Sequence, residues 1–183
     1  ALIGNPTVWS LLPSVDVLVF GLGGMDTLPS PLPTYLRQGI RYLRPNALRR
    51  KVRSAYQASQ PMLARLLRGR PVALPPRLTV DYLDRCLLGI RSIRPELPAV
   101  AALPSVHRAR SYGYVHTGHA PGTRAIADWG ARRGVPLIDL PALVGEHVRT
   151  GAGNPDGMHW GWSAHRIVGE AFAMAIKNLL ATD

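Results

Sequence analysis

Residues 15–26 read VDVLVFGLGGMD, a short apolar run that ends in a glycine-rich turn. The run from Val15 to Phe20 is rich in β-branched residues, and Asp16 is its only charged residue. A strand this apolar is typical of a parallel sheet, in which both faces of a strand are buried. The glycines that follow predict a sharp turn of the backbone at the carboxyl end of the strand.

Two common nucleotide-binding motifs do not fit this turn. The dinucleotide fingerprint G-x-G-x-x-G would need a glycine where the chain has Asp26. A P-loop would need Gly-Lys followed by Ser or Thr, and that sequence does not follow the strand. The turn is therefore not predicted to hold the phosphates of a nucleotide.

Two further apolar runs predict strands at residues 99–103 and 135–140. Helical patterns separate and follow them, over residues 79–90 with Thr79 as cap, 123–133, 142–150, and a last helix capped by Ser163. Alternating strands and helices predict an α/β fold, a parallel sheet sandwiched by helices. The 183 residues are enough for one domain.

Residues 32–76 are predicted to form a basic helical insertion in this domain. A helical pattern begins near Leu32 and is interrupted at Pro45. The segment after it carries a dense group of positive charges that includes Arg49, Arg50, Lys51 and Arg53. One interpretation is a pair of solvated amphipathic helices, and the other is a lid or docking surface for an anionic substrate.

Composition limits the partners of the chain. The formal charge is +11, but Lys51 and Lys177 are the only lysines among 22 basic residues, which indicates codon bias more than phosphate binding. No nucleic-acid-binding motif accompanies the charge, so no nucleic-acid partner is predicted. No apolar run approaches the roughly 20 residues that span a bilayer. Cys86 is the only cysteine, which favours a reducing compartment, and we expect the protein to be cytoplasmic.

The loop NPDGMHW, residues 154–160, carries a candidate catalytic pair. Asp156 lies three residues before His159, with Gly157 between them, so its carboxylate can fold back onto the imidazole. It would then fix the histidine tautomer and leave the other ring nitrogen free to take a proton from a nucleophile. The alternative interpretation is a simple turn with a surface histidine.

The predicted sheet brings this loop close to two other turns. Residues 21–26 and 104–107 both follow predicted strands, and the 156–159 loop follows the last one after a helix. Ligands of open parallel sheets bind beyond the carboxyl ends of the strands. We therefore expect the three segments to meet at one rim, which favours the catalytic interpretation.

A strand followed by Gly-x-x-Asp, a proline-containing strand end, and Asp-Gly-x-His before the last helix resemble the SGNH (GDSL) hydrolases. The resemblance implies a flavodoxin-like sheet and a Ser-His-Asp triad that uses His159 and Asp156. It also implies that the turn Gly23, Gly24, Met25 and Asp26 binds the oxyanion or substrate. Met25 stands where the family has an asparagine, and a thioether donates no hydrogen bond. Backbone N–H groups of Gly24 or Met25 would replace it, or the oxyanion would be held more weakly.

Residues 23–30, 40–45, 103–107 and 153–160 together resemble a narrower family, the mycobacterial diglucosylglycerate octanoyltransferases. This resemblance implies transfer of an octanoyl group from a thioester, such as octanoyl-CoA, to a glucosylglycerate-type sugar, in methylglucose lipopolysaccharide biosynthesis. It implies no cofactor. The family's serine and its first two strands lie upstream of residue 1. We therefore expect strand 15–20 to be an open edge that a missing segment covers, as a separate chain or within a homo-oligomer.

Other residues near the predicted rim have two interpretations each. Trp160 and Trp162 either wall the substrate site or pack the last helix. Ser105 is a candidate nucleophile or substrate-binding residue, or part of a structural turn, and His107 is a candidate substrate-binding residue. A metal site is not predicted, because His116 and His119 have no evident third ligand.

Two other functions compete with acyl transfer. A carboxylester or thioester hydrolase of the same fold would use the same residues and differ only in whether water or a sugar reaches the acyl-enzyme. A basic binding protein without catalysis would keep the fold and use its positive charge.

Overall fold

The computed structural model describes residues 4–181 and shows a three-stranded parallel sheet in the order β1-β2-β3. The strands are β1 (Leu18–Phe20), β2 (Ala99–Ala102) and β3 (Leu137–Ile138). The α/β fold with a helix-flanked parallel sheet is confirmed. The strands are shorter than the apolar runs that predicted them. In the third run Pro136 has no N–H to donate to the ladder, so β3 begins after it.

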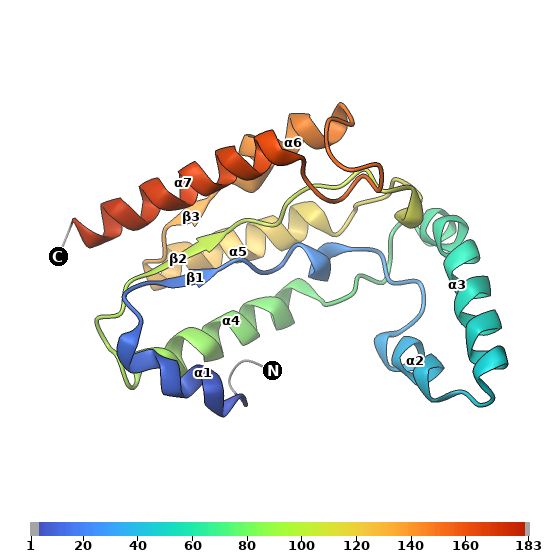
Figure 1. Ribbon diagram of the computed structural model, residues 1–183, viewed down its shortest axis with the longest axis horizontal. Coiled ribbons are helices and arrows are strands. Elements are labelled where there is room, and N and C mark those ends of the chain that lie inside the picture. The colour runs from blue at the N-terminus through green and yellow to red at the C-terminus, as the bar shows by residue number, and fades with distance from the viewer. Residues whose placement is uncertain (1–3, 182–183) are drawn as a thin grey trace.

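Most of the helices flank this sheet (Figure 1). Their bounds are α1 (Pro6–Leu11), α2 (Thr34–Gly39), α3 (Asn46–Leu66), α4 (Pro76–Arg91), α5 (His119–Arg133), α6 (Leu140–Arg149) and α7 (Trp162–Leu180). Both predicted caps were wrong. Thr79 lies inside α4, because Pro76 is already suited to the first helical position. The N-cap of α7 is Gly161, so Ser163 lies inside this helix.

The sheet separates two hydrophobic clusters. Ala99 and Ala101 point into the cluster formed with α4 and α5, which includes the fully buried Trp129. Val100 and Ala102 point to the opposite face and pack with residues of α6 and α7. Because successive side chains of a strand point to opposite faces, β2 is buried on both sides, as its apolar sequence predicts.

The basic segment stands away from the sheet. The helices α2 and α3, with a 3-10 turn between them (Ile40–Tyr42), lie at the right-hand end of the molecule in Figure 1. A new helix starts after Pro45, so the predicted break there is confirmed. Ala64 is the only buried residue of α3, which makes this helix mostly solvated. Its division from the domain as an insertion stays a prediction.

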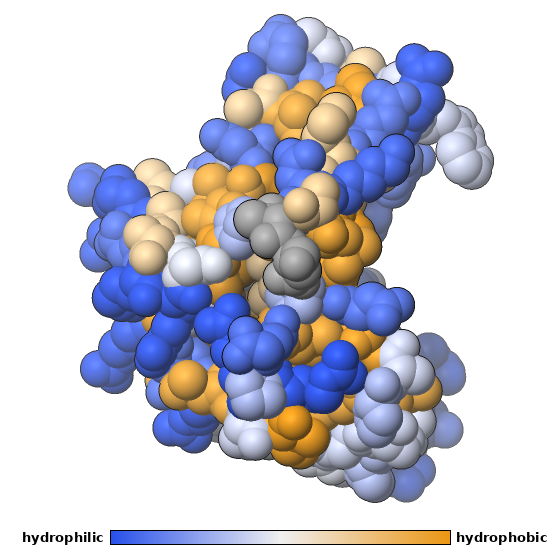
Figure 2. Space-filling model, turned by 90° about the vertical axis from the view of Figure 1, so that its left-hand side faces the viewer, coloured by the Kyte–Doolittle hydropathy of each residue, from blue (hydrophilic) through white to orange (hydrophobic). Residues whose placement is uncertain are grey.

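Strand β1 has a free edge within residues 4–181, since it pairs only with β2. Val19 in its middle is 43% exposed. On the end of the molecule seen in Figure 2, apolar surface gathers between more polar upper and lower parts. A strand from outside these residues could pair at this edge, and that expectation stays a prediction. Among the described helices, none combines the length and the apolarity that a bilayer-crossing helix requires.

Candidate active site

Asp156 and His159 form a hydrogen-bonded pair just before α7. The Nδ1 of His159 lies 2.5 Å from Oδ2 of Asp156. An ionised carboxylate only accepts hydrogen bonds, so the imidazole carries a proton on Nδ1 and donates it to Asp156. The Nε2 of His159 then presents a lone pair and has no hydrogen-bond partner within residues 4–181. The histidine side chain is 72% exposed, so this nitrogen is available to a reacting group.

Backbone donors keep Asp156 ionised. Its Oδ1 accepts hydrogen bonds from the N–H groups of Met158 at 2.9 Å and His159 at 3.1 Å. These bonds, the Met158 N–H first, and the contact with the His159 ring lower the pKa of Asp156 to about 2. The carboxylate is therefore charged at neutral pH and can stabilise the imidazolium that forms when Nε2 takes a proton.

The loop around this pair is closed by its own hydrogen bonds. Asn154 binds the carbonyl of His159 through its backbone N–H and the carbonyl of Trp160 through its side chain. Gly157 has φ +71, and a Cβ there would lie 2.4 Å from the carbonyl oxygen of Arg108. The backbone N–H of Arg108 donates to the Gly157 carbonyl at 2.8 Å. Glycine is therefore needed both for the turn and for its close contact with the neighbouring segment.

An open pocket of about 400 Å³ brings the three predicted rim segments together. Its lining comes from the turn after β1, the segment after β2 and the loop before α7, and includes Gly21, Gly24, Met25, Leu28, Ser105, Val106, His107, Met158, His159, Trp160 and His165. The predicted convergence of these segments is confirmed. Their roles in catalysis stay predictions.

The turn Gly23–Met25 places Gly24 and Met25 in the lining of this pocket. Gly23 has φ +99, and a Cβ there would lie 2.8 Å from Ile126 Cδ1, so only glycine fits. The Gly23 carbonyl accepts the N–H of Asp26 and closes the turn. The N–H groups of Gly24 and Met25 form no hydrogen bond within the described part of the chain. Paired backbone N–H groups of this kind can stabilise an oxyanion.

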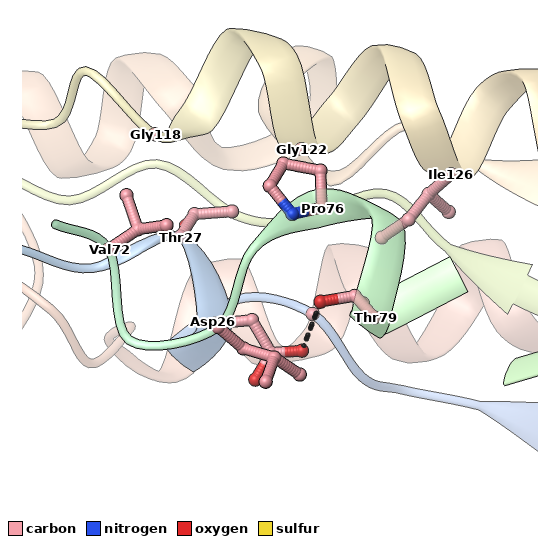
Figure 3. A pocket seen from close by; sticks show the side chains of 10 residues that line it. Asp26, Thr27, Val72, Pro76, Thr79, Gly118, Gly122 and Ile126 are labelled. Atoms are coloured by element: carbon pink, nitrogen blue, oxygen red, sulfur yellow. Dashed lines mark hydrogen bonds between the residues drawn. The ribbon is translucent and has the colours of Figure 1, made fainter. Parts of the chain in front are cut away.

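The side chain of Asp26 points away from this pocket. Its Oδ2 accepts a hydrogen bond of 2.9 Å from the hydroxyl of Thr79, which Figure 3 shows on the first turns of α4. Asp26 does not line the pocket of His159. It therefore anchors the turn to α4, a contact that the assignment of Thr79 as a helix cap had missed.

The start of α5 fixes the other side of the turn (Figure 3). A Cβ at Gly118 would lie 2.3 Å from the carbonyl oxygen of Thr27, and one at Gly122 would lie 2.6 Å from its Cγ2. The hydroxyl of Thr27 donates to the carbonyl of Gly24 at 2.8 Å, and His116 Nε2 lies 2.9 Å from the same hydroxyl. A hydroxyl has one proton, so the Nε2–H of His116 is the donor in the second bond.

Three histidine rings lie close together in tilted contacts. His116 lies between His107 and His119, with ring centroids 3.9 and 4.9 Å away. Burial, together with the neighbouring histidines, lowers the pKa of His116 to about 3 and that of His107 to about 4. Both rings are therefore neutral at pH 7. Within residues 4–181 no group of three or more His, Cys, Asp or Glu side chains is arranged to hold a metal ion.

The remaining candidates have distinct positions. Ser105 accepts a hydrogen bond from Nε1 of Trp160 at 3.2 Å and directs its own hydroxyl to the Val106 carbonyl, so its proton is not offered to His159. Trp160 lines the pocket and also packs against the cluster under α7. Trp162 is 93% exposed and does not line the pocket, so neither of its two interpretations is supported. His165 also lines the pocket, although no sequence motif indicated it, and its ring centroid lies 5.4 Å from that of Trp160.

Comparison with known proteins identifies relatives of the whole chain. It is 49% identical over 174 residues to the diglucosylglycerate octanoyltransferase of Mycolicibacterium hassiacum, a match that covers 95% of this chain and 71% of the relative. It is 45% identical over 174 residues to the protein of the same name from Mycobacterium tuberculosis, with 95% and 69% covered.

No protein-family model matches the chain, and no solved structure matches it significantly. The wider resemblance to the SGNH hydrolases therefore stays a prediction. Nearly half of the residues are shared with two relatives over almost the full chain, and about two thirds or more of each relative is covered. The chain belongs to the diglucosylglycerate octanoyltransferase family.

Proposed function

We propose that this protein is an acyltransferase that moves an octanoyl group from a thioester to a hydroxyl of a glucosylglycerate-type sugar. The observation that carries the proposal is the Asp156–His159 pair, since His159 lines one pocket together with Gly24 and Met25. The names of the relatives supply the acyl group and the acceptor.

The first half of the reaction would form an acyl-enzyme. A serine hydroxyl attacks the thioester carbonyl carbon, and Nε2 of His159 takes the hydroxyl proton. The N–H groups of Gly24 and Met25 donate to the oxyanion of the tetrahedral intermediate. As the intermediate collapses, the C–S bond breaks and the imidazolium returns the proton to the leaving thiolate.

The second half would transfer the acyl group to the sugar. A sugar hydroxyl attacks the serine ester while His159 removes its proton, and the serine oxygen leaves and is protonated by the same imidazolium. Asp156 stays ionised throughout and stabilises the positive charge on His159 in both halves. Neither half requires a cofactor.

We propose that the nucleophilic serine belongs to a part of the protein outside these 183 residues. The chain spans about 70% of the length of the two relatives, which leaves room for such a segment. Ser105 is the alternative within the chain, but its hydroxyl is bonded to the Val106 carbonyl and to Trp160. The free edge of β1 is where a preceding strand with its serine would pair.

The experiment that tests the proposal uses the full-length enzyme with octanoyl-CoA, with and without a diglucosylglycerate acceptor. Mass spectrometry should detect octanoylated sugar, formed only with His159 intact, and a transient octanoyl group on a serine peptide. Release of free octanoate at the same rate with and without the sugar would identify a hydrolase instead. Salt-sensitive nucleic-acid binding without any acyl chemistry would identify a binding protein.

A further inference from the structure

A second pocket lies on the other side of the turn that carries the candidate oxyanion donors. It has a volume of about 490 Å³ and lies between the end of β1, this turn and one face of α4. Gly21, Gly24 and Met25 line both this pocket and the one that contains His159. A single stretch of backbone therefore separates the two spaces.

The lining of the second pocket is apolar. Its buried side chains are Phe20, Leu83 and Cys86, with exposed fractions of 4%, 4% and 8%. Leu22 and Tyr82 stand at its rim and are 51% and 53% exposed. Burial raises the pKa of the Cys86 thiol, so this side chain stays uncharged at neutral pH.

Two polar side chains of this lining pair with each other. Asp26 and Thr79 both line the pocket, and the threonine hydroxyl donates to the aspartate at 2.9 Å. The inner wall of Phe20, Leu83 and Cys86 is apolar, so it suits a hydrocarbon chain better than a sugar, which needs several hydrogen bonds. The pocket of His159 differs in this respect, because Ser105 and His107 contribute polar groups to it.

We propose that the second pocket binds the hydrocarbon chain of the transferred acyl group, and that Cys86 and Tyr82 help to set the chain length that the enzyme accepts. This inference rests on the proposed acyl transfer. The volume of the second pocket is typical of pockets that enclose small ligands. The carbonyl carbon lies at the turn, the chain runs toward α4, and the sugar approaches from the side of His159.

The test compares butanoyl-, octanoyl- and dodecanoyl-CoA as donors for the full-length enzyme, with kcat/KM measured for each. Burial of each additional methylene group raises the binding affinity roughly fourfold. Donors whose chains fill the pocket should therefore have clearly higher kcat/KM than donors with shorter chains. Cys86→Leu narrows the inner part of the pocket and should lower the octanoyl-to-butanoyl ratio about tenfold. Tyr82→Ala opens the rim and should raise the dodecanoyl-to-octanoyl ratio by a similar factor.

Leu88→Phe is the matched control. Leu88 lies on the same helix, is 47% exposed and does not line the pocket, so the ratios should not change. Tyr82 is exposed at the rim, so Tyr82→Ala should not disturb folding. This variant therefore tests the inference even if Cys86→Leu fails to fold.

Unchanged ratios in folded, active Cys86→Leu and Tyr82→Ala enzymes would overturn the inference and would indicate that other parts of the protein fill the pocket. This outcome differs from failure of the proposed function, in which the unmodified enzyme consumes none of the three thioesters.

Discussion

Replacing Asp156 by asparagine should change the protonation of the His159 ring while the loop around it keeps its fold. The amide oxygen of Asn can take the place of Oδ1 and keep accepting the N–H groups of Met158 and His159. The amide nitrogen then lies where Oδ2 accepts from His159 Nδ1. Because an amide NH₂ group only donates, Nδ1 must become the acceptor and the ring proton moves to Nε2. His159 can then no longer take a proton from the nucleophile.

The expected loss of kcat/KM for Asp156→Asn is on the order of a thousandfold or more. A thousandfold loss is about 4 kcal/mol of transition-state stabilisation. The effect on folding should be much smaller, because the Asp156 side chain is 47% exposed and an exposed ionic contact contributes about 0–1 kcal/mol. Activity and stability should therefore respond very differently to the same substitution.

The assay measures kcat/KM for octanoyl-CoA in the full-length enzyme and the melting temperature of each variant by circular dichroism. His159→Ala should abolish turnover, and Asp156→Asn should lose somewhat less. Glu146→Gln is the matched control, since Glu146 is an exposed carboxylate on α6 that pairs with Arg149. It should keep full activity.

Near-normal kcat/KM in folded Asp156→Asn or His159→Ala enzyme would refute the assignment of this pair as the catalytic base and its orienting group. A large fall in melting temperature that accompanies the lost activity would instead show that Asp156 acts by holding the loop together.

Three further perturbations test the surroundings of the site. The pKa of His116 is lowered to about 3 in the folded protein, so below pH 6.5 the unfolded chain binds more protons than the folded one. The free energy of unfolding should therefore fall as the pH is lowered from 6.5, by up to about 1.4 kcal/mol per pH unit. Urea titrations at pH 7 and pH 5 measure this fall, and His116→Gln should reduce it. Gly122→Ala would place a Cβ 2.6 Å from a neighbouring side chain, which should cost about 1–3 kcal/mol in unfolding experiments, whereas Gly169→Ala, where the Cβ meets nothing, should not destabilise. If the positive face of α3 attracts an anionic donor, reversing the charges of Arg50 and Lys51 should raise KM and weaken its salt dependence with little change in kcat, and unchanged kinetics would assign these residues to a solvated surface.

The layered fold was predictable because its signals are local. An apolar run such as residues 99–103 indicates a buried strand by itself, and the alternation of such runs with helical patterns predicts the parallel sheet. The Asp156–His159 contact was predictable for the same reason, since three residues and a glycine are enough to form it. The ends of the strands were less predictable, because they depend on which backbone groups find a partner.

The contacts that hold the turn after β1 join residues far apart in the sequence. Thr27 and His116 are separated by 89 positions, and Asp26 and Thr79 by 53. A residue of such a type also suits a local role, as a threonine suits a helix cap, and a single sequence does not indicate which role is used. His116 and His119 stand three residues apart, and their spacing alone does not indicate that the two rings contact each other with centroids 4.9 Å apart.

Different hydrogen bonds of the His159 loop set the protonation of the imidazole and its position over the pocket. Bonds within the loop, from Asn154 and to Asp156, fix how the imidazole is oriented and protonated. Bonds that leave the loop, such as those from Gly161 to His147 and from Trp160 to Ser105, fix where the loop lies over the pocket. Substitutions at the outer contacts can thus move the imidazole of His159 over the pocket without changing its protonation. The position of the base and its basicity are therefore free to evolve independently.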